Sequence, residues 1–204
     1  FSDRCAAPLI AFYRSEGLWD ELVSLHDVLR DQSHDPELQA DYSYRQAHVY
    51  RDQLQNFDAA FDSLARAWKL MPRQDVWRSE LVALTEVRTS WGELASVYEE
   101  VLLQVSDPER IKVLRVELAV IYRDQLDNTH EAEVQLQEAL NLDERDIDLY
   151  EALEAMYTRQ ERWQDLVDLI DRRYVVFIDQ PEANELLLRI ATIHDEFARD
   201  AAGR

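Results

Sequence analysis

The chain has 204 residues, of which 47% are hydrophobic and 31% are charged, so it is a foldable sequence and not a disordered tail. Three Gly and five Pro are too few for a turn-rich all-β fold, and a single Cys excludes an internal disulfide framework and a cysteine-built zinc site. The net charge of −20 disfavours direct binding to nucleic acid or to an anionic membrane, and it favours basic partners.

No apolar run approaches the roughly 18–20 residues that span a bilayer, so no membrane insertion is expected. The one unpaired cysteine, Cys5, suits a reducing compartment such as the cytoplasm, and nothing else in the sequence indicates a localisation. The sequence begins with Phe1 and not with Met, as expected for a segment cut from a longer chain.

An internal repeat of 72 residues organises the chain. Trp19, Trp91 and Trp163 each precede a Leu by three residues, and the pentapeptide Tyr-Arg-Asp-Gln-Leu occurs at 50–54 and again at 122–126. An ungapped alignment of 19–90 with 91–162 gives 22 identical positions out of 72, which indicates duplication of one structural unit. The tryptophans are interpreted as packing anchors, with a ligand cage as the alternative.

Each 72-residue unit contains four helical patterns. In the first full unit they cover Pro36–Leu54, Asn56–Leu70, Asp75–Arg88 and Trp91–Val105, and the next unit repeats them from Pro108. A short segment with the same pattern precedes the first unit at 1–16, and another follows at 185–204. These two ends are out of phase with the repeat, which favours a single segment, 1–204, excised from a longer array.

Helix-terminus residues support these boundaries. Gly17 is a predicted left-handed helix stop, and Ser90 with Glu93 three residues later predicts a capping box. The other predicted capping residues are Asp35, Asn56, Asp107 and Asn128.

Two helix pairs resemble the tetratricopeptide repeat (TPR) family. The first carries small and large apolar residues at Ala47, Tyr50, Ala60, Leu64 and Ala67, followed by Pro72, and the second repeats the pattern at 119–142. The pairs at 75–105 and 147–177 depart from it. The resemblance implies an all-α fold: a right-handed α-α superhelix, or α-solenoid, of antiparallel helix pairs in 72-residue double repeats.

No catalytic set emerges from the sequence. The three glycines are isolated, so no phosphate-binding loop is present, and no pair of histidines has the spacing of a helical zinc motif. Abundant carboxylates are interpreted as a solvated face. We therefore expect no enzyme activity, no cofactor and no metal.

In TPR-like arrays the first helix of each pair lines the concave face, which commonly holds the partner. Matching positions in the intervening pair are Val76, Ser79, Ala83 and Glu86, and Val113, Val116 and Val120 follow in the next long copy. The repeated Arg-Asp pairs have a structural alternative, since they could serve the turn of the repeat or an inter-repeat ion pair. The candidate partner-binding residues are Asp41, Tyr44, His48, Arg51, Asp52, Arg123 and Asp124.

The leading functional hypothesis is a non-enzymatic scaffold that binds a peptide or protein, with a basic partner favoured by the charge. The alternatives are a structural spacer or assembly element, a regulatory array attached to an enzyme outside these residues, and a scaffold within an RNA-processing complex.

Overall fold

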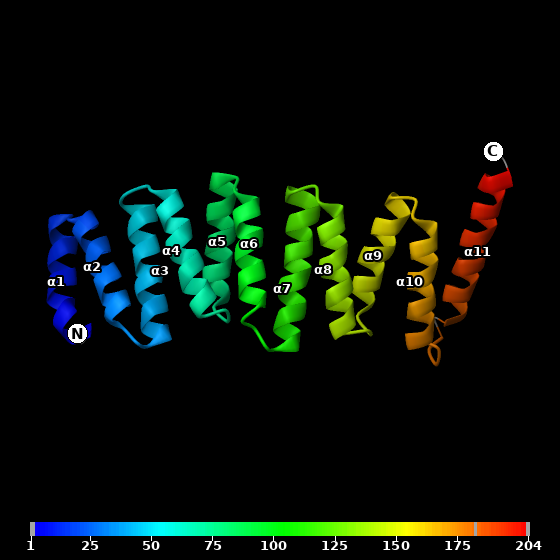
Figure 1. The fold of residues 1–204 in the computed structure, drawn as a ribbon, viewed down its shortest axis with the longest axis horizontal. Helices are drawn as coiled ribbons and strands as arrows, with labels where there is room; N and C mark the ends of the chain where they lie inside the picture. Colours follow the sequence, from blue (N-terminus) through cyan, green and yellow to red (C-terminus); the bar gives the residue numbers. More distant parts are fainter. Residues whose placement is uncertain (1–2, 182, 203–204) are drawn as a thin grey trace. The chain divides into compact units, whose positions relative to one another are not determined.

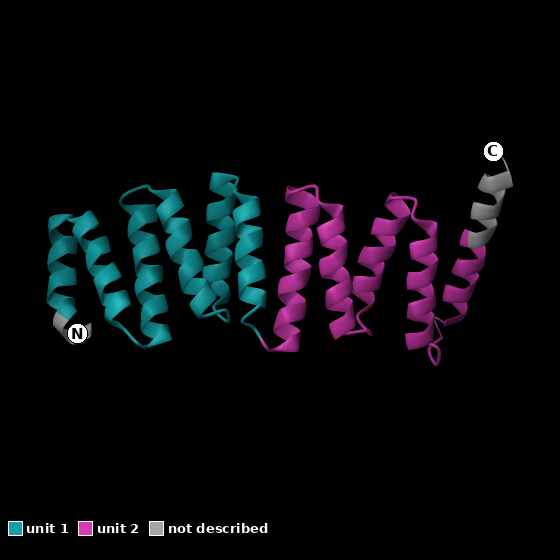
Figure 2. Cartoon of the chain, in the orientation of Figure 1, with its two compact units in different colours: residues 1–105 teal, residues 106–204 magenta. Residues whose placement is uncertain are grey.

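The computed structural model describes the backbone of residues 3–181 and 183–202 and the side chains of residues 6–181 and 183–193. Within these ranges the regular structure is helical, as predicted, and no strand occurs (Figure 1). The chain forms two compact units, 1–105 and 106–204 (Figure 2).

Unit 1 is a series of helices joined by short turns, each packed against the next. The helix that begins at Pro36 ends at Asp52, two residues before the predicted end, whereas the helix predicted at Asp75–Arg88 has those bounds. The helices are α1 (Asp3–Glu16), α2 (Trp19–Gln32), α3 (Pro36–Asp52), α4 (Phe57–Leu70), α5 (Asp75–Arg88) and α6 (Trp91–Leu102).

Unit 2 has the same kind of helix order, with one short π-helical segment, η1, at the end of its first helix. Its last helix covers most of the segment predicted at 185–204. The elements are α7 (Pro108–Val120), η1 (Ile121–Gln125), α8 (Thr129–Leu142), α9 (Ile147–Arg159), α10 (Trp163–Val176) and α11 (Ala183–Ala202).

Small residues allow the closest helix pairs to pack. Ala47 on α3 and Ala60 and Ala67 on α4 are buried, and Ala132 and Ala139 of α8 are fully buried at the corresponding places in unit 2. A side chain no larger than a methyl group lets two helix backbones approach, and larger side chains such as Leu and Tyr fill the remaining core. The tryptophans at 19, 91 and 163 each begin a helix, as expected.

The repeated pentapeptide ends its helix in the same way in both units. The amide of Leu54 donates to the carbonyl of Val49, and the amide of Leu126 donates to that of Ile121. These bonds span five residues and widen the last turn, which explains why α3 ends before Leu54. In each unit the chain then continues into an Asn-capped helix, where the Asn56 or Asn128 side chain accepts from the backbone.

Asp107 and Ser90 occupy the N-cap positions of α7 and α6, as predicted, but neither side chain makes a capping bond. Asp35 accepts a hydrogen bond from the amide of Glu37, but the Asp107 side chain makes no capping bond. The predicted capping box does not form: the Ser90 hydroxyl is buried without a partner among the described residues, and the Glu93 carboxylate binds Arg88. A charged acceptor near an arginine forms the stronger bond.

Residues with left-handed backbone angles lie in several of the turns between one helix and the next. Gly17, Thr89 and Glu161 have φ of 70°, 54° and 56°, and each lies two residues before the tryptophan that begins the next helix. Gln55 and Asp127, with φ of 53° and 50°, lie before the two Asn caps. Gly17 is therefore the predicted helix stop, and non-glycine residues adopt the same strained conformation elsewhere.

Candidate interaction surfaces

Four of the seven predicted partner-binding residues lie together on α3, where they meet two side chains of α5 that the sequence did not single out. Apart from Asp52, which is exposed, these side chains are partly buried. We call this group the α3–α5 cluster; its members are Tyr44, His48, Arg51, Asp52, Trp77 and Glu80.

Glu80 is the common acceptor of the α3–α5 cluster. The Tyr44 hydroxyl donates to Glu80 Oε1 at 3.0 Å, and Arg51 Nη1 donates to Glu80 Oε2 at 3.0 Å. The Nε2 atom of His48 lies 3.4 Å from the same Oε2. Burial and the bond to Glu80 raise the pKa of Tyr44 above its ordinary value, so this hydroxyl stays a donor at neutral pH.

Arg51 joins the rest of the cluster. It holds Asp52 through two bonds, Nε to Oδ1 at 2.7 Å and Nη2 to Oδ2 at 3.2 Å, which lower the pKa of Asp52. The same Nη2 lies 2.7 Å from His48 Nδ1. Arginine can only donate, so Nδ1 acts as the acceptor and the proton of this imidazole is on Nε2, which lies near Glu80.

Aromatic rings cover one part of the α3–α5 cluster. The rings of Tyr44 and Trp77 are stacked, with centroids 5.0 Å apart and an angle of 24°, and the ring of His48 meets Tyr44 edge-on at 4.5 Å. Partly exposed aromatic rings beside an arginine are typical of the residues that dominate protein interfaces. The remaining residue predicted in this unit, Asp41, lies outside the cluster and forms an ion pair with Arg45 at 2.6 Å.

The predicted residues of unit 2, Arg123 and Asp124, bind each other. Arg123 Nε donates to Asp124 Oδ1 at 2.7 Å and Nη2 donates to Oδ2 at 2.9 Å, the geometry that Arg51 makes with Asp52. Both side chains are exposed by more than two fifths, at 41% and 44%. The hydrogen bond lowers the pKa of Asp124 and raises that of Arg123.

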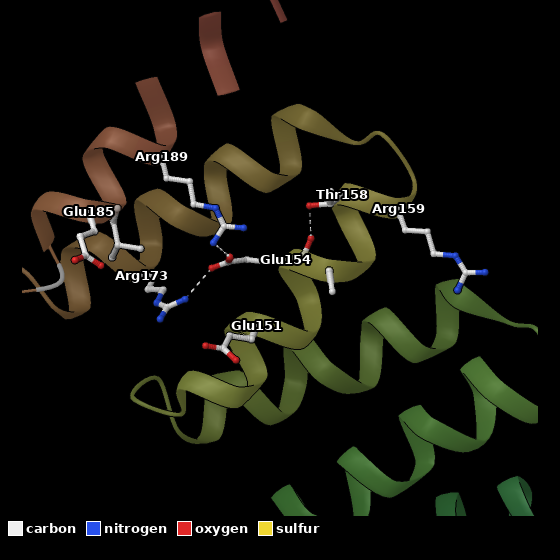
Figure 3. Close-up of a pocket in the computed structure, with 9 residues that line it drawn as sticks. Glu151, Glu154, Thr158, Arg159, Arg173, Glu185 and Arg189 are labelled. Carbon is white, nitrogen blue, oxygen red and sulfur yellow. Dashed lines mark hydrogen bonds and ion pairs between the residues drawn. The ribbon is translucent and has the colours of Figure 1, made fainter. Parts of the chain in front are cut away.

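Unit 2 also contains a cavity of about 710 Å³, which the sequence analysis did not predict. One face of α9 forms one wall, and residues of α10 and α11 line the rest of this open cavity (Figure 3). The lining combines charged and small side chains: Glu151, Glu154, Ala155, Thr158, Arg159, Arg173, Glu185, Leu186 and Arg189.

A buried carboxylate lies at the centre of this cavity wall. Glu154 is only 3% exposed, and its two oxygens bind Arg173 from α10, at 2.9 Å, and Arg189 from α11. Figure 3 shows both arginines pointing at Glu154, whereas Arg159 points away from it. Glu151 and Glu185 are exposed acids of the same lining, and with Arg159 they bring it to three glutamates and three arginines, so the charges of the lining balance.

A signal for Glu154 was present in the sequence. The apolar stripe of α9 includes Tyr150, Leu153 and Tyr157, and Glu154 falls on the same face because it lies four residues after Tyr150 and three before Tyr157. A charge at such a position indicates a buried ion pair, since an isolated buried carboxylate is very costly. Its partners could not be identified, because Arg173 and Arg189 come from other helices.

Two further classes of site were searched within the described residues. No group of three or more His, Cys, Asp or Glu side chains there is arranged to hold a metal ion. None of the described helices combines the length and the apolar character that a membrane-spanning helix needs. The side chain of Cys5 lies outside the described residues.

Comparisons with known proteins give weak resemblances. No protein-family model and no curated protein matches the chain. Among solved structures, MamA from Desulfovibrio magneticus RS-1, residues 41 to the end, is 15% identical with a TM-score of 0.39, over 96% of this chain and 97% of that one. A MamA RS-1 ArsTM double mutant is 16% identical with a TM-score of 0.40, over 98% of each chain. Such scores are too low to establish a shared fold.

Proposed function

We propose that this chain is a non-enzymatic interaction module, a TPR-like segment that binds a peptide or protein on the face formed by the first helix of each pair. In this proposal the face comprises α3 and α5 in unit 1 and α7, α9 and α11 in unit 2. The concave, right-handed superhelix expected from the sequence belongs to the same proposal. The net charge of −20 favours a basic partner.

The cavity between α9 and α11 is the observation that carries the proposal. Its volume of about 710 Å³ lies in the range of binding pockets, roughly 300–1,000 Å³. The lining offers small residues for close approach, such as Ala155, and arginine donors with fixed geometry, such as Arg173. The α3–α5 cluster supports the same face in unit 1, because aromatic and arginine side chains lie partly exposed there.

Site-specific photo-cross-linking tests the proposal. A benzoylphenylalanine at Ala155 would place the reactive group in the cavity, and the matched control carries it at Ala11, an exposed alanine of α1. In extracts of the producing cells we expect discrete protein adducts at position 155 and not at position 11. With the benzoylphenylalanine kept at position 155, the substitution Thr158→Trp, at an exposed residue of the same lining, should narrow the cavity and abolish those adducts while leaving the free energy of unfolding within about 0.5 kcal/mol.

Equal cross-linking at both positions would contradict the proposal, because it would show nonspecific contact. Absence of adducts at position 155 would also contradict it, and an array that captures nothing is the behaviour expected of a structural spacer. Turnover of a small molecule by the purified chain would exclude the non-enzymatic part of the proposal.

A further inference from the structure

The repeated pentapeptide places an arginine at the same position in two copies, so the surroundings of the two arginines can be compared within one chain. Arg51 and Arg123 occupy the same place in the two copies, at the end of α3 and within η1. Each arginine binds the next residue, an aspartate, through Nε and Nη2. The backbone closes behind both through the same five-residue hydrogen bond. The two guanidinium groups are therefore held in equivalent ways by their own segments.

The two arginines differ at Nη1. Arg51 Nη1 donates to Glu80 of α5, but Arg123 Nη1 has no acceptor within the part of unit 2 that the structure describes. The residue 72 positions after Glu80 is Ala152, which has no carboxylate. An intramolecular acceptor that completes the first arrangement is therefore absent from the second.

Apolar side chains replace the polar ones beside Arg123. Val116 and Val120 stand 72 positions after Tyr44 and His48, and Val113 precedes them on the same face of α7. Val113 and Val120 are each 42% exposed. Exposed aliphatic side chains in line with a guanidinium form a surface that is apolar along its length and that ends in a hydrogen-bond donor, Nη1 of Arg123, within a neutral Arg123–Asp124 pair.

We propose that Arg123, with Val113 and Val120, binds a partner segment that carries a carboxylate next to an apolar side chain. The carboxylate would accept a hydrogen bond from Nη1 of Arg123, as Glu80 accepts one from Nη1 of Arg51, and the apolar side chain would pack on Val113 and Val120. The pair formed by Arg123 and Asp124 has no net charge, so one added carboxylate does not face an uncompensated anion there. This site rests on the proposed function and adds one local feature of the partner, a carboxylate facing α7, within a partner whose overall charge is expected to be basic.

Peptide binding to the full chain tests the site with a defined probe. Two tetrapeptides, acetylated and amidated, have the sequences Gly-Leu-Glu-Gly and Gly-Leu-Gln-Gly and differ only in charge. The Nε–Hε NMR signal of Arg123, assigned with Arg123→Lys, reports binding at millimolar peptide concentration. We expect the Glu peptide to bind roughly two- to fivefold more tightly than the Gln peptide, which corresponds to the strength of an exposed ion pair.

Reciprocal substitutions exchange the two arrangements. Ala152→Glu should supply the missing acceptor and abolish the preference for the Glu peptide, whereas Glu80→Ala should make the Arg51 signal respond to that peptide. Arg123→Gln, at a position whose side chain is 41% exposed, should also abolish the preference.

The proposal would be overturned if both peptides bound equally, or if neither moved the Arg123 signal. Persistence of the preference in Arg123→Gln would overturn it too. These outcomes are independent of the cross-linking at Ala155. Adducts at position 155 without a preference for the Glu peptide would contradict the Arg123 site alone. A preference for the Glu peptide without adducts at position 155 would support the Arg123 site and contradict the proposal for the cavity.

Discussion

The helices of the α3–α5 face of unit 1 and of the α7–α9 face of unit 2 begin 72 residues apart, at Pro36 and Pro108 and at Asp75 and Ile147, but the two faces carry different chemistry. Unit 1 has a polar and aromatic network around Glu80, whereas unit 2 has Val116, Val120 and Ala152 at the positions 72 residues later. The buried alanines between helices, by contrast, occur in both units, as Ala60 and Ala132 illustrate. Packing thus fixes the residues between helices, and the outward face of the first helices is free to vary.

The largest predicted effect concerns the cavity in unit 2. Val82 stands 72 residues before Glu154, so Glu154→Val gives unit 2 the residue of unit 1. We expect it to lower the free energy of unfolding by about 3 kcal/mol, because Arg173, whose side chain is 13% exposed, loses its carboxylate. Urea unfolding measures the loss.

The control for that substitution is Glu151→Val, on the same helix but exposed, where a change within about 0.5 kcal/mol is expected. The double variant with Arg173→Val, which copies Val101 of unit 1, should recover most of the loss, since no buried charge is left unpaired. Equal losses of stability in Glu154→Val and Glu151→Val would contradict a stabilising role for the pair of Glu154 with Arg173.

A second test uses a buried histidine of unit 1 that is replaced by an apolar residue at the equivalent position of unit 2. His26 of unit 1 is 1% exposed, and burial, aided by Arg45 and Arg14, lowers its pKa from 6.5 to about 4. Both ring nitrogens lack hydrogen-bond partners among the described residues. Because the unfolded chain binds this proton more readily, stability is complete above pH 6.5 and is lost as the pH falls towards 4, by up to about 3 kcal/mol.

The variant His26→Ile copies Ile170, the residue two repeats later, and should remove this part of the acid dependence. Urea unfolding at several pH values between 7 and 4 measures it, with the exposed His34→Gln as the control. An unchanged pH dependence in His26→Ile would show that other groups cause the acid loss.

The smallest predicted effect concerns the left-handed residues in two of the turns. Thr89 adopts φ of 54° although it is β-branched, while Gly17 fills the corresponding place one repeat earlier. Thr89→Gly should raise stability by about 1 kcal/mol, and Gly17→Ala should lower it by a similar amount. Thermal unfolding of the two variants beside the parent chain measures both changes. A loss of stability in Thr89→Gly would mean that the Thr89 side chain contributes more than its backbone strain costs.

Helix positions could be predicted from the sequence because they depend on local patterns. The capping of α3 by Asp35 and the limits of α5 follow from residues within or next to each helix. The early end of α3 could not be predicted, because the wide turn before Leu54 has no sequence signal apart from its repetition.

The surfaces were predictable only along single helices. Tyr44, His48 and Arg51 share a helical face, so their proximity follows from spacing alone. Their partners on α5 are Trp77 and Glu80, each one residue after the predicted Val76 and Ser79. One residue is a rotation of about 100° on a helix. The error thus lies in which face α5 turns towards α3, and this depends on packing between distant segments.

The attachment of α11 to its unit has an electrostatic part that follows from Glu154. Arg189 reaches that buried carboxylate from α11, and its own side chain is 48% exposed. Mobile ions screen a half-exposed cation far more than they weaken apolar packing. We therefore expect added salt to weaken the pair of Arg189 with Glu154, and with it the attachment of α11 to α9, before it weakens the apolar packing within unit 2.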